Sequence, residues 1–377
     1  MRTCLVTKAY FNPHQTMVNN HVANLFGGDV VVLAADQLAE DPHGRPVHFW
    51  APGSRGQRSG LWRDAVSLWQ HRTTRVPGPA ARRGIRDFLA TERAEAVLIE
   101  FGDVAARLTP ALEGCRLPVF TYFRGSDASE HLARPFRAAS LRRMMPRLAG
   151  VFAVSQFLLD QLAARGVVHP ESTVIPSGVD TDRFRPGTKR PRSFLAVGRL
   201  IEKKRPDLTV TAFCCAAAGH PDARLELIGD GPLAARCRAI AEAHGLADRV
   251  ILRGRQPHAA VQTALAEAEV FLQHSVTGRD GDTEGLPTAI QEAMAAGAVV
   301  ISTRHAGIPE AVAQDDTGWL VAEGDSAGFA ARIRAALDDP ARLPGMAARA
   351  RAVAVERFDN RRLTRRLEAR MRALSGR

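Results

Sequence analysis

Two acidic residues flank the start of a predicted helix in the segment from Glu284 to Gly297. Pro287 suits the first position of that helix, where its missing N–H is no loss, and Gly297 is a typical C-terminal stop. The first turn of a helix leaves backbone N–H groups unpaired, which makes it an anion site. Carboxylates at Glu284 and Glu292 can also accept hydrogen bonds from the vicinal hydroxyls of a sugar. The simpler alternatives are a helix-capping acid for Glu284 and a surface glutamate for Glu292.

A second candidate group follows the apolar run 194–197, which we predict to be a strand. Gly198 allows the chain to turn at the end of this strand. Arg199 and Lys204 come next, ahead of a predicted helix. Two cations at the end of a strand suit a diphosphate, because charge-assisted hydrogen bonds offset its charge. A solvated basic loop is the competing interpretation.

Short apolar strands, such as 96–100 and 119–123, alternate with helical stretches, such as 140–148, along most of the chain, which predicts parallel sheets covered on both faces. A polar segment with two glycines and two prolines, 177–191, interrupts this alternation and is typical of a linker. We therefore predict an α/β protein with two doubly wound, Rossmann-like domains, at 1–178 and 190–355. The Arg-rich helical tail 356–377 follows the second sheet, and we expect it to cross back onto the first domain.

Composition narrows the class of protein. The chain has 377 residues and a formal net charge of +11, but it contains no helix-turn-helix, RNP-like or zinc-finger pattern that would indicate nucleic acid. No apolar run reaches the roughly 18 residues that span a membrane, and the N-terminus lacks a signal-peptide cleavage site, so we expect a cytoplasmic protein. The five cysteines form no C-x-x-C pair, and we expect neither a disulfide framework nor a zinc site.

The spacing of Glu284 and Glu292, with seven residues between them, resembles the E-x7-E pattern of retaining glycosyltransferases with the GT-B fold, family 4 (glycosyltransferase group 1). Further motifs match the family in its order: Val154-Ser155, Ser177-Gly178-Val179-Asp180, Gly198-Arg199…Glu202-Lys203-Lys204, Gly229-Asp230-Gly231-Pro232-Leu233 and Arg304-His305-Ala306-Gly307-Ile308-Pro309-Glu310. The likeness runs from about residue 150 to 355. It implies an acceptor domain followed by a nucleotide-sugar domain, with the two facing a cleft.

The resemblance also implies roles for individual residues. Arg199 and Lys204, with Gly198, would bind the donor diphosphate, and Glu292 would hold the ribose hydroxyls. Glu284 would hold the donor sugar, together with the backbone of Gly285, Leu286 and Pro287. Arg255 and Gln256 would lie along the base, and His274, at a strand end, is expected to reach the same site. The family needs no metal or other cofactor, so we interpret Asp280-Gly281-Asp282 as a polar loop rather than a D-x-D metal motif.

The sequence departs from the family at two points. The loop after the first strand, Asn12-Pro13-His14-Gln15-Thr16, lacks the usual paired glycines. The stretch Arg124-Gly125-Ser126-Asp127 has arginine where the family has the histidine of His-Gly-x-Asp. An imidazole can donate and accept, whereas arginine can only donate. We predict that Arg124 and Asp127 orient donor and acceptor, and a mutual salt bridge is the alternative.

The predicted function is transfer of a hexose-type sugar from a nucleotide sugar to a saccharide or lipid-linked saccharide in envelope or exopolysaccharide synthesis. The arginines around 135–147 lie among apolar residues and predict contact with an anionic membrane at the inner face of the cell membrane. A solvated Arg-rich helix is the competing interpretation. The alternatives for the whole chain are a small-molecule acceptor, a nucleotide-sugar epimerase, or a non-catalytic nucleotide-sugar binder.

Overall fold

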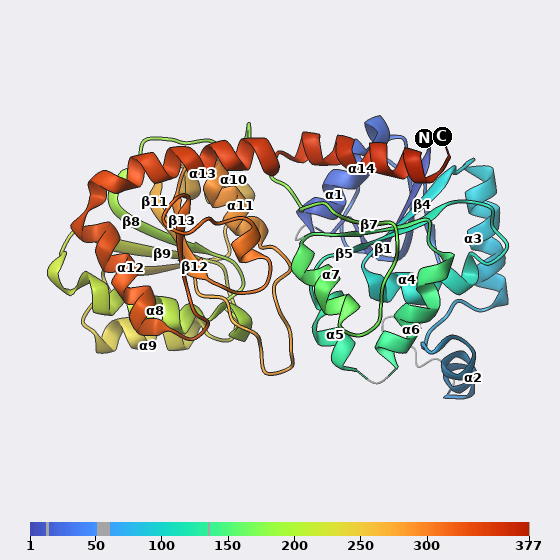
Figure 1. Cartoon of the computed structure of the whole chain (residues 1–377), viewed down its shortest axis with the longest axis horizontal. Helices are drawn as coiled ribbons and strands as arrows, with labels where there is room; N and C mark the ends of the chain where they lie inside the picture. Colours follow the sequence, from blue (N-terminus) through green and yellow to red (C-terminus); the bar gives the residue numbers. More distant parts are fainter. Residues whose placement is uncertain (13–14, 51–60, 135, 377) are drawn as a thin grey trace. The chain divides into compact units, whose positions relative to one another are not determined.

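The computed structural model describes residues 1–12, 15–50, 61–134 and 136–376. They form two compact units, Met1–Pro176 together with Thr364–Arg377, and Ser177–Leu363. Each unit is an α/β structure with one sheet and helices around it (Figure 1). None of the helices in the described part of the chain combines the length and apolar character that a bilayer crossing requires.

The described residues of the first unit form a seven-stranded parallel sheet with the order β3-β2-β1-β4-β5-β6-β7. Its strands are β1 (Thr3–Tyr10), β2 (Val30–Gln37), β3 (Val47–Phe49), β4 (Ala96–Glu100), β5 (Val119–Phe123), β6 (Gly150–Ala153) and β7 (Ser172–Val174). Its helices are α1 (Thr16–Asn24), α2 (Leu61–His71), α3 (Pro79–Thr91), α4 (Gly102–Leu108), α5 (Glu130–Ala133), α6 (Arg137–Met144) and α7 (Gln156–Ala163). The central strands are buried throughout, as expected for a sheet covered on both faces.

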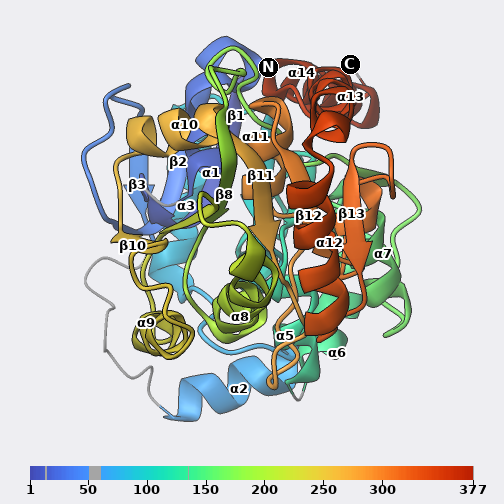
Figure 2. The same ribbon diagram turned by 90° about the vertical axis from the view of Figure 1, so that its left-hand side faces the viewer.

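The described residues of the second unit form a six-stranded parallel sheet with the order β10-β9-β8-β11-β12-β13. Its strands are β8 (Arg190–Val197), β9 (Arg224–Ile228), β10 (Val250–Gly254), β11 (Ala268–Gln273), β12 (Val299–Thr303) and β13 (Gly318–Val321). Its helices are α8 (Pro206–Ala216), α9 (Ala234–Ala243), α10 (His258–Glu267), α11 (Thr288–Ala295), α12 (Ser326–Asp338) and α13 (Leu343–Arg357). Helix α8 packs against α9 and α12, and α11 packs against α10 and α13 (Figure 2).

The C-terminal helix α14 (Asn360–Leu374) begins in the second unit and continues in the first. Within the first unit, Glu368 accepts a 2.6 Å hydrogen bond from the backbone N–H of Phe26, and Arg370 pairs with Glu171. The side chain of Leu374 lies so close to Gly150 that a Cβ there would be 2.7 Å from it. The last turns of the chain are therefore part of the first unit.

The segment between the two sheets differs from the predicted linker. The sequence interpretation ended the first domain at residue 178 and began the second at 190, whereas residues 177–190 group with the second unit. Gly178 donates to the side chain of Gln291 over 2.9 Å, and Arg351 donates to the carbonyls of Thr181 and Phe184. These long-range bonds fix a segment whose composition alone indicated a loose connection.

Candidate functional site

Two glycine-containing loops meet at the carboxyl ends of β8 and β9. Gly198 has φ +144° and Gly229 has φ +140°, both in the range that favours glycine. A Cβ on Gly229 would lie 1.9 Å from the carbonyl oxygen of Gly198, so the two backbones touch. This close approach holds the loop that carries the predicted cations.

Both lysines of this loop form ion pairs with the segment ahead of α11. Lys204 Nζ lies 3.1 Å from Glu284 Oε1, and Lys203 Nζ lies 2.9 Å from Asp282 Oδ2. The side chains of Lys204 and Glu284 keep only 16% and 12% of their surface exposed. The Lys204–Glu284 contact lacks hydrogen-bond alignment, so it is an electrostatic pair whose polar atoms can still bond to a ligand.

Burial and neighbouring charge act in opposite directions on Glu284. Burial raises the pKa of its carboxyl group, but the ammonium groups of Lys204 and Lys203 hold that pKa below its usual value. Glu284 is therefore an ionised hydrogen-bond acceptor at neutral pH. Asp282 is engaged by Lys203, and no cluster of three or more metal-binding side chains occurs within the described ranges.

A buried histidine fixes the backbone of Glu284. The N–H of Glu284 donates to His305 Nε2 over 3.1 Å, and His305 Nδ1 donates to Glu323 over 2.6 Å. Because Nε2 accepts, the proton of the ring is on Nδ1. Glu323 also accepts the N–H of Thr277 over 2.8 Å. No role was predicted for His305 or Glu323; a histidine two residues after the buried strand β12 was the available signal.

Helix α11 positions the remaining acidic residue. It begins at Thr288, with Pro287 as its N-cap rather than its first residue, and Gly297 with φ +67° follows its end. The carbonyl of Gly285 accepts the N–H of Gly307 over 3.0 Å, and that of Leu286 accepts from a side-chain amide over 3.4 Å. These bonds hold the backbone ahead of the helix with its first-turn N–H groups free for a ligand.

Glu292 lies one turn inside α11, with 15% of its side chain exposed. Burial raises its pKa to about 7, and the attraction of Lys204 only partly offsets that increase. The neighbouring His258 Nε2 is 4.0 Å from its carboxylate. A carboxyl group with this pKa changes charge easily when a ligand donates hydrogen bonds to it.

The other predicted donor residues have different positions. Arg199 is exposed beside a small hollow that Gly198 and Lys204 also line, and Arg255 is exposed on the loop after β10. His274, by contrast, is fully buried: its Nε2 accepts the N–H of Gly324 over 3.1 Å. Burial lowers its pKa to about 4. The expectation that His274 reaches a ligand is therefore not met in this structure, because the neutral ring faces the protein interior.

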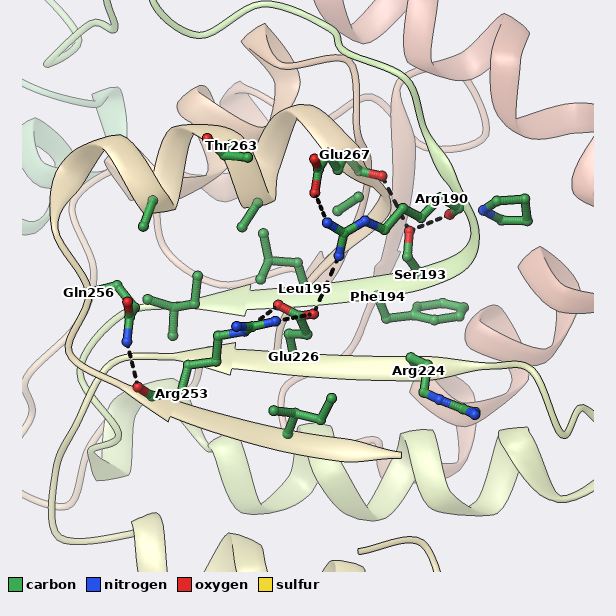
Figure 3. Close-up of a pocket in the computed structure, with 16 residues that line it drawn as sticks. Arg190, Ser193, Phe194, Leu195, Arg224, Glu226, Arg253, Gln256, Thr263 and Glu267 are labelled. Carbon is green, nitrogen blue, oxygen red and sulfur yellow. Dashed lines mark hydrogen bonds and ion pairs between the residues drawn. The ribbon is translucent and has the colours of Figure 1, made fainter. Parts of the chain in front are cut away.

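Gln256 lines a separate hollow of about 500 Å³ across the face of β8, β9 and β10 beside α10 (Figure 3). The amide of Gln256 donates to the carbonyl of Arg253 over 2.7 Å. Four charged groups of this hollow already pair with one another: Glu226 accepts two bonds from Arg253, and Arg190 pairs with Glu267. The hollow extends along the sheet rather than at the carboxyl ends of the strands, so it is distinct from the Lys204–Glu284 site.

In the first unit, Asp127 shapes the loop after β5. It is 1% exposed and accepts backbone N–H bonds from Gly102, Arg124 and Gly125 at 2.8, 3.0 and 2.9 Å. Burial raises the pKa of its carboxyl group, and these three bonds oppose the increase. Asp127 therefore connects the loops after β4 and β5.

Arg124 pairs with a residue that the sequence analysis did not select. Its Nε donates to Glu100 over 2.8 Å, and its guanidinium carbon lies 4.0 Å from the centre of the Tyr122 ring. Glu100 is fully buried, yet its pKa falls to about 2, because the charge of Arg124 and the hydrogen bonds from Arg124 and His21 outweigh the effect of burial. An acid that ends the otherwise apolar strand β4 was a readable signal. Residues 13 and 14, which belong to the segment 12–16 without paired glycines, lie outside the described ranges.

These two parallel-sheet units, with charged residues at the carboxyl ends of their strands, define a GT-B glycosyltransferase fold. The family described as Glycosyl transferases group 1 matches residues 179–353, and that described as Glycosyltransferase Family 4 matches residues 27–183. The chain belongs to the group 1 glycosyltransferases and is an enzyme of that class.

The named relatives of this chain are also glycosyltransferases. The chain is 33% identical over 349 residues to the candidate colanic acid biosynthesis glycosyltransferase WcaL of Escherichia coli, covering 89% of this chain and 85% of that protein. It is 31% identical to the amylovoran biosynthesis glycosyltransferase AmsK of Erwinia amylovora, over 63% of this chain and 60% of the relative.

Solved structures share the fold over nearly the whole chain. Anabaena Alr3699/HepE in complex with UDP has a TM-score of 0.77 at 17% identity, covering 99% of this chain and 100% of that chain. A glycosyltransferase from Rickettsia africae also has a TM-score of 0.77, at 14% identity, covering 99% of this chain and 98% of that chain.

Proposed function

We propose that this glycosyltransferase moves a hexose-type sugar from a nucleoside diphosphate sugar to a saccharide or lipid-linked saccharide, with retention of the anomeric configuration. The observation that carries the proposal is the 3.1 Å pair of Lys204 and Glu284 ahead of α11. In this pair, the ammonium group of Lys204 can bind phosphate oxygens, and the carboxylate of Glu284 can accept hydrogen bonds from sugar hydroxyls. The two groups are adjacent, as the phosphate and the sugar of such a donor are.

Each group would act on a different part of the donor. Lys204 and the exposed Arg199 would bind the diphosphate, and the ionised Glu284 would accept hydrogen bonds from the sugar. Glu292 would accept from the ribose hydroxyls. In the reaction, the bond from the sugar C1 to the diphosphate oxygen breaks, and the acceptor oxygen bonds to C1 on the same face. The acceptor proton passes to the departing phosphate oxygen.

The two cations would stabilise the charge that develops on the departing diphosphate, so we propose a reaction that needs no metal ion. Removing one preorganised group of this kind typically costs on the order of 10²–10³ in rate. His305 would act as a positioning residue, because it holds the backbone of Glu284 rather than a substrate.

The names of relatives support a hexose donor and an acceptor of the polysaccharide or glycolipid class. They include colanic acid and amylovoran biosynthesis, and also a GDP-mannose-dependent mannosyltransferase of Mycobacterium tuberculosis that is 30% identical over 67% of this chain. We therefore propose a hexose donor and an acceptor of the exopolysaccharide or envelope class.

We also propose that the enzyme works in the cytoplasm, at the inner face of the cell membrane, through the basic segment 136–147. Leu141, Met144 and Met145 of this segment are buried in the first unit and unavailable to a bilayer, whereas Arg142 and Arg143 are exposed. Attachment would thus combine the exposed arginines with the exposed ring of Phe136, and its electrostatic part would be sensitive to salt. Absence of binding to anionic vesicles at low salt would remove this part of the proposal.

The decisive experiment incubates the purified chain, with EDTA, with a panel of UDP-, GDP- and dTDP-hexoses and measures donor hydrolysis and transfer. We expect one donor to be consumed, and the anomeric configuration of the product to match that of the donor. Turnover by Lys204→Ala or Glu284→Ala at the wild-type rate would contradict the site. Arg192→Ala, far along β8 from its carboxyl end, is a matched control.

A further inference from the structure

A histidine on α1 lies against the carboxyl ends of two strands in the first unit. His21 Nδ1 is 2.7 Å from Glu100 Oε1, and Glu100 is the last residue of β4. The imidazole also stacks on Tyr122 of β5, with ring centroids 5.8 Å apart and an interplanar angle of 28°. The side chain of His21 is 5% exposed. Its contacts with Glu100 and Tyr122 fix both the position and the rotation of the ring.

The partners of Glu100 determine which nitrogen of the ring is available. Arg124 donates to Glu100 Oε2, so the carboxylate cannot turn away from His21. Glu100 is ionised and can only accept; Nδ1 must therefore carry a proton. The contact with Glu100 thus orients an imidazole whose second nitrogen, Nε2, is left without a hydrogen-bond partner among the described residues.

We propose that His21 Nε2 binds a sugar hydroxyl during transfer, as a hydrogen-bond acceptor beside Arg124. This inference rests on the proposed function. The guanidinium of Arg124 lies 3.5 Å from Nδ1 of the His21 ring, so the two side chains are neighbours. Arginine has no acceptor atom, and Nε2 supplies one. Glu100 and Arg124 are positioning residues for it.

The location supports a ligand-binding role. In open α/β sheets, ligands bind beyond the carboxyl ends of the strands, which is where Glu100 and Arg124 lie. A buried pair of charges that served stability alone would be replaceable by apolar residues of similar volume. Here the pair instead holds a third, polar side chain in one orientation.

The test compares His21→Phe, which keeps the ring but removes both nitrogens, with His21→Gln and with the control His48→Phe. We expect His21→Phe to lower kcat/KM for transfer by about 10- to 100-fold, the effect of one hydrogen bond to substrate. We expect His21→Gln to recover part of the lost kcat/KM, because the glutamine amide oxygen can accept a hydrogen bond. His48→Phe should change kcat/KM less than threefold. Melting curves check that each variant is folded.

Two measurements, donor hydrolysis without acceptor and transfer, show whether the hydroxyl bound by His21 belongs to the donor or to the acceptor. If it belongs to the donor sugar, donor hydrolysis without acceptor falls together with transfer. If it belongs to the acceptor, hydrolysis is unchanged while transfer falls and the acceptor KM rises. Rates of both reactions within threefold of wild type in His21→Phe would overturn the inference. Wild-type inactivity with every donor would instead overturn the proposed function, and this inference with it.

An NMR spectrum that reports the tautomer of the His21 ring gives an independent test. In ¹⁵N-histidine-labelled protein, we expect His21 to show a protonated Nδ1, and this signal to move in Glu100→Gln. The reverse tautomer, with the proton on Nε2 and none on Nδ1, would also overturn the inference.

Discussion

Replacing Glu292 by glutamine should remove a specific pH dependence from the stability of the second unit. Folding raises the pKa of this carboxyl group from 4.5 to about 7, because α11 buries it. The folded state therefore binds the proton more tightly than the unfolded state. The resulting stabilisation is fully present below pH 4.5 and is lost as the pH rises through 7.

The size of the effect follows from the shift. At about 1.4 kcal/mol per pKa unit, the shift changes the free energy of unfolding by roughly 3 kcal/mol. Because 15% of the side chain is exposed, we reduce this value to about 2–3 kcal/mol. For a unit of this size, that corresponds to about 5–10 °C in melting temperature. Glutamine has a similar shape and no charge, so Glu292→Gln should gain this amount relative to wild type between pH 5 and pH 8.

Scanning calorimetry at pH 5, 6, 7 and 8 measures the difference between wild type and Glu292→Gln at each pH. Subtracting the two curves cancels groups common to both proteins. Glu356→Gln, an exposed glutamate on α13, is the matched control and should show a constant difference. A difference for Glu292→Gln that stays within about 1 °C over this range would refute the reasoning.

The same carboxyl group links donor binding to protons. If ribose hydroxyls donate to ionised Glu292, binding lowers its pKa and releases about half a proton at pH 7. Calorimetric titration with the active nucleotide in two buffers of different ionisation enthalpy measures this release. It should vanish in Glu292→Gln.

Other predictions concern single contacts. Lys204→Ala and Glu284→Ala should each lower transfer by about 10²–10³ in variants whose melting curves show that they are folded at the assay temperature; normal transfer by both purified variants would refute the site. His305→Ala leaves the Glu284 N–H without its partner, so it should lower kcat more than it raises the donor KM, and unchanged kinetics would exclude a positioning role. Glu368→Ala removes the bond from Phe26 to α14 and should destabilise the first unit by about 1–2 kcal/mol, measured by urea unfolding, with Glu356→Ala as control.

Much of the fold could be read from local patterns. The strands β4 and β5 have the predicted bounds, because short runs of Val, Leu, Ile and Phe are typical of buried parallel strands. Helix α6 begins three residues before the predicted helix 140–148 and ends at Met144, since Pro146 cannot continue the α-helical bonding and the turn becomes a 3₁₀ segment. The strand β13 (Gly318–Val321) was not predicted: four residues after a polar turn carry little periodicity.

The sequence by itself determined the kinds of groups at the site: two cations after β8, two carboxylates around α11, and glycines where the backbones touch. Only the tertiary structure decided which groups pair. Lys203 and Asp282 are 79 positions apart, as are His21 and Glu100, and their contacts depend on the order of strands in each sheet. A local pattern holds no information about that order. For the same reason, the sequence offered only the nearby Asp127 as an alternative salt-bridge partner for Arg124, whereas the folded sheet brings Glu100 to it from the neighbouring strand β4.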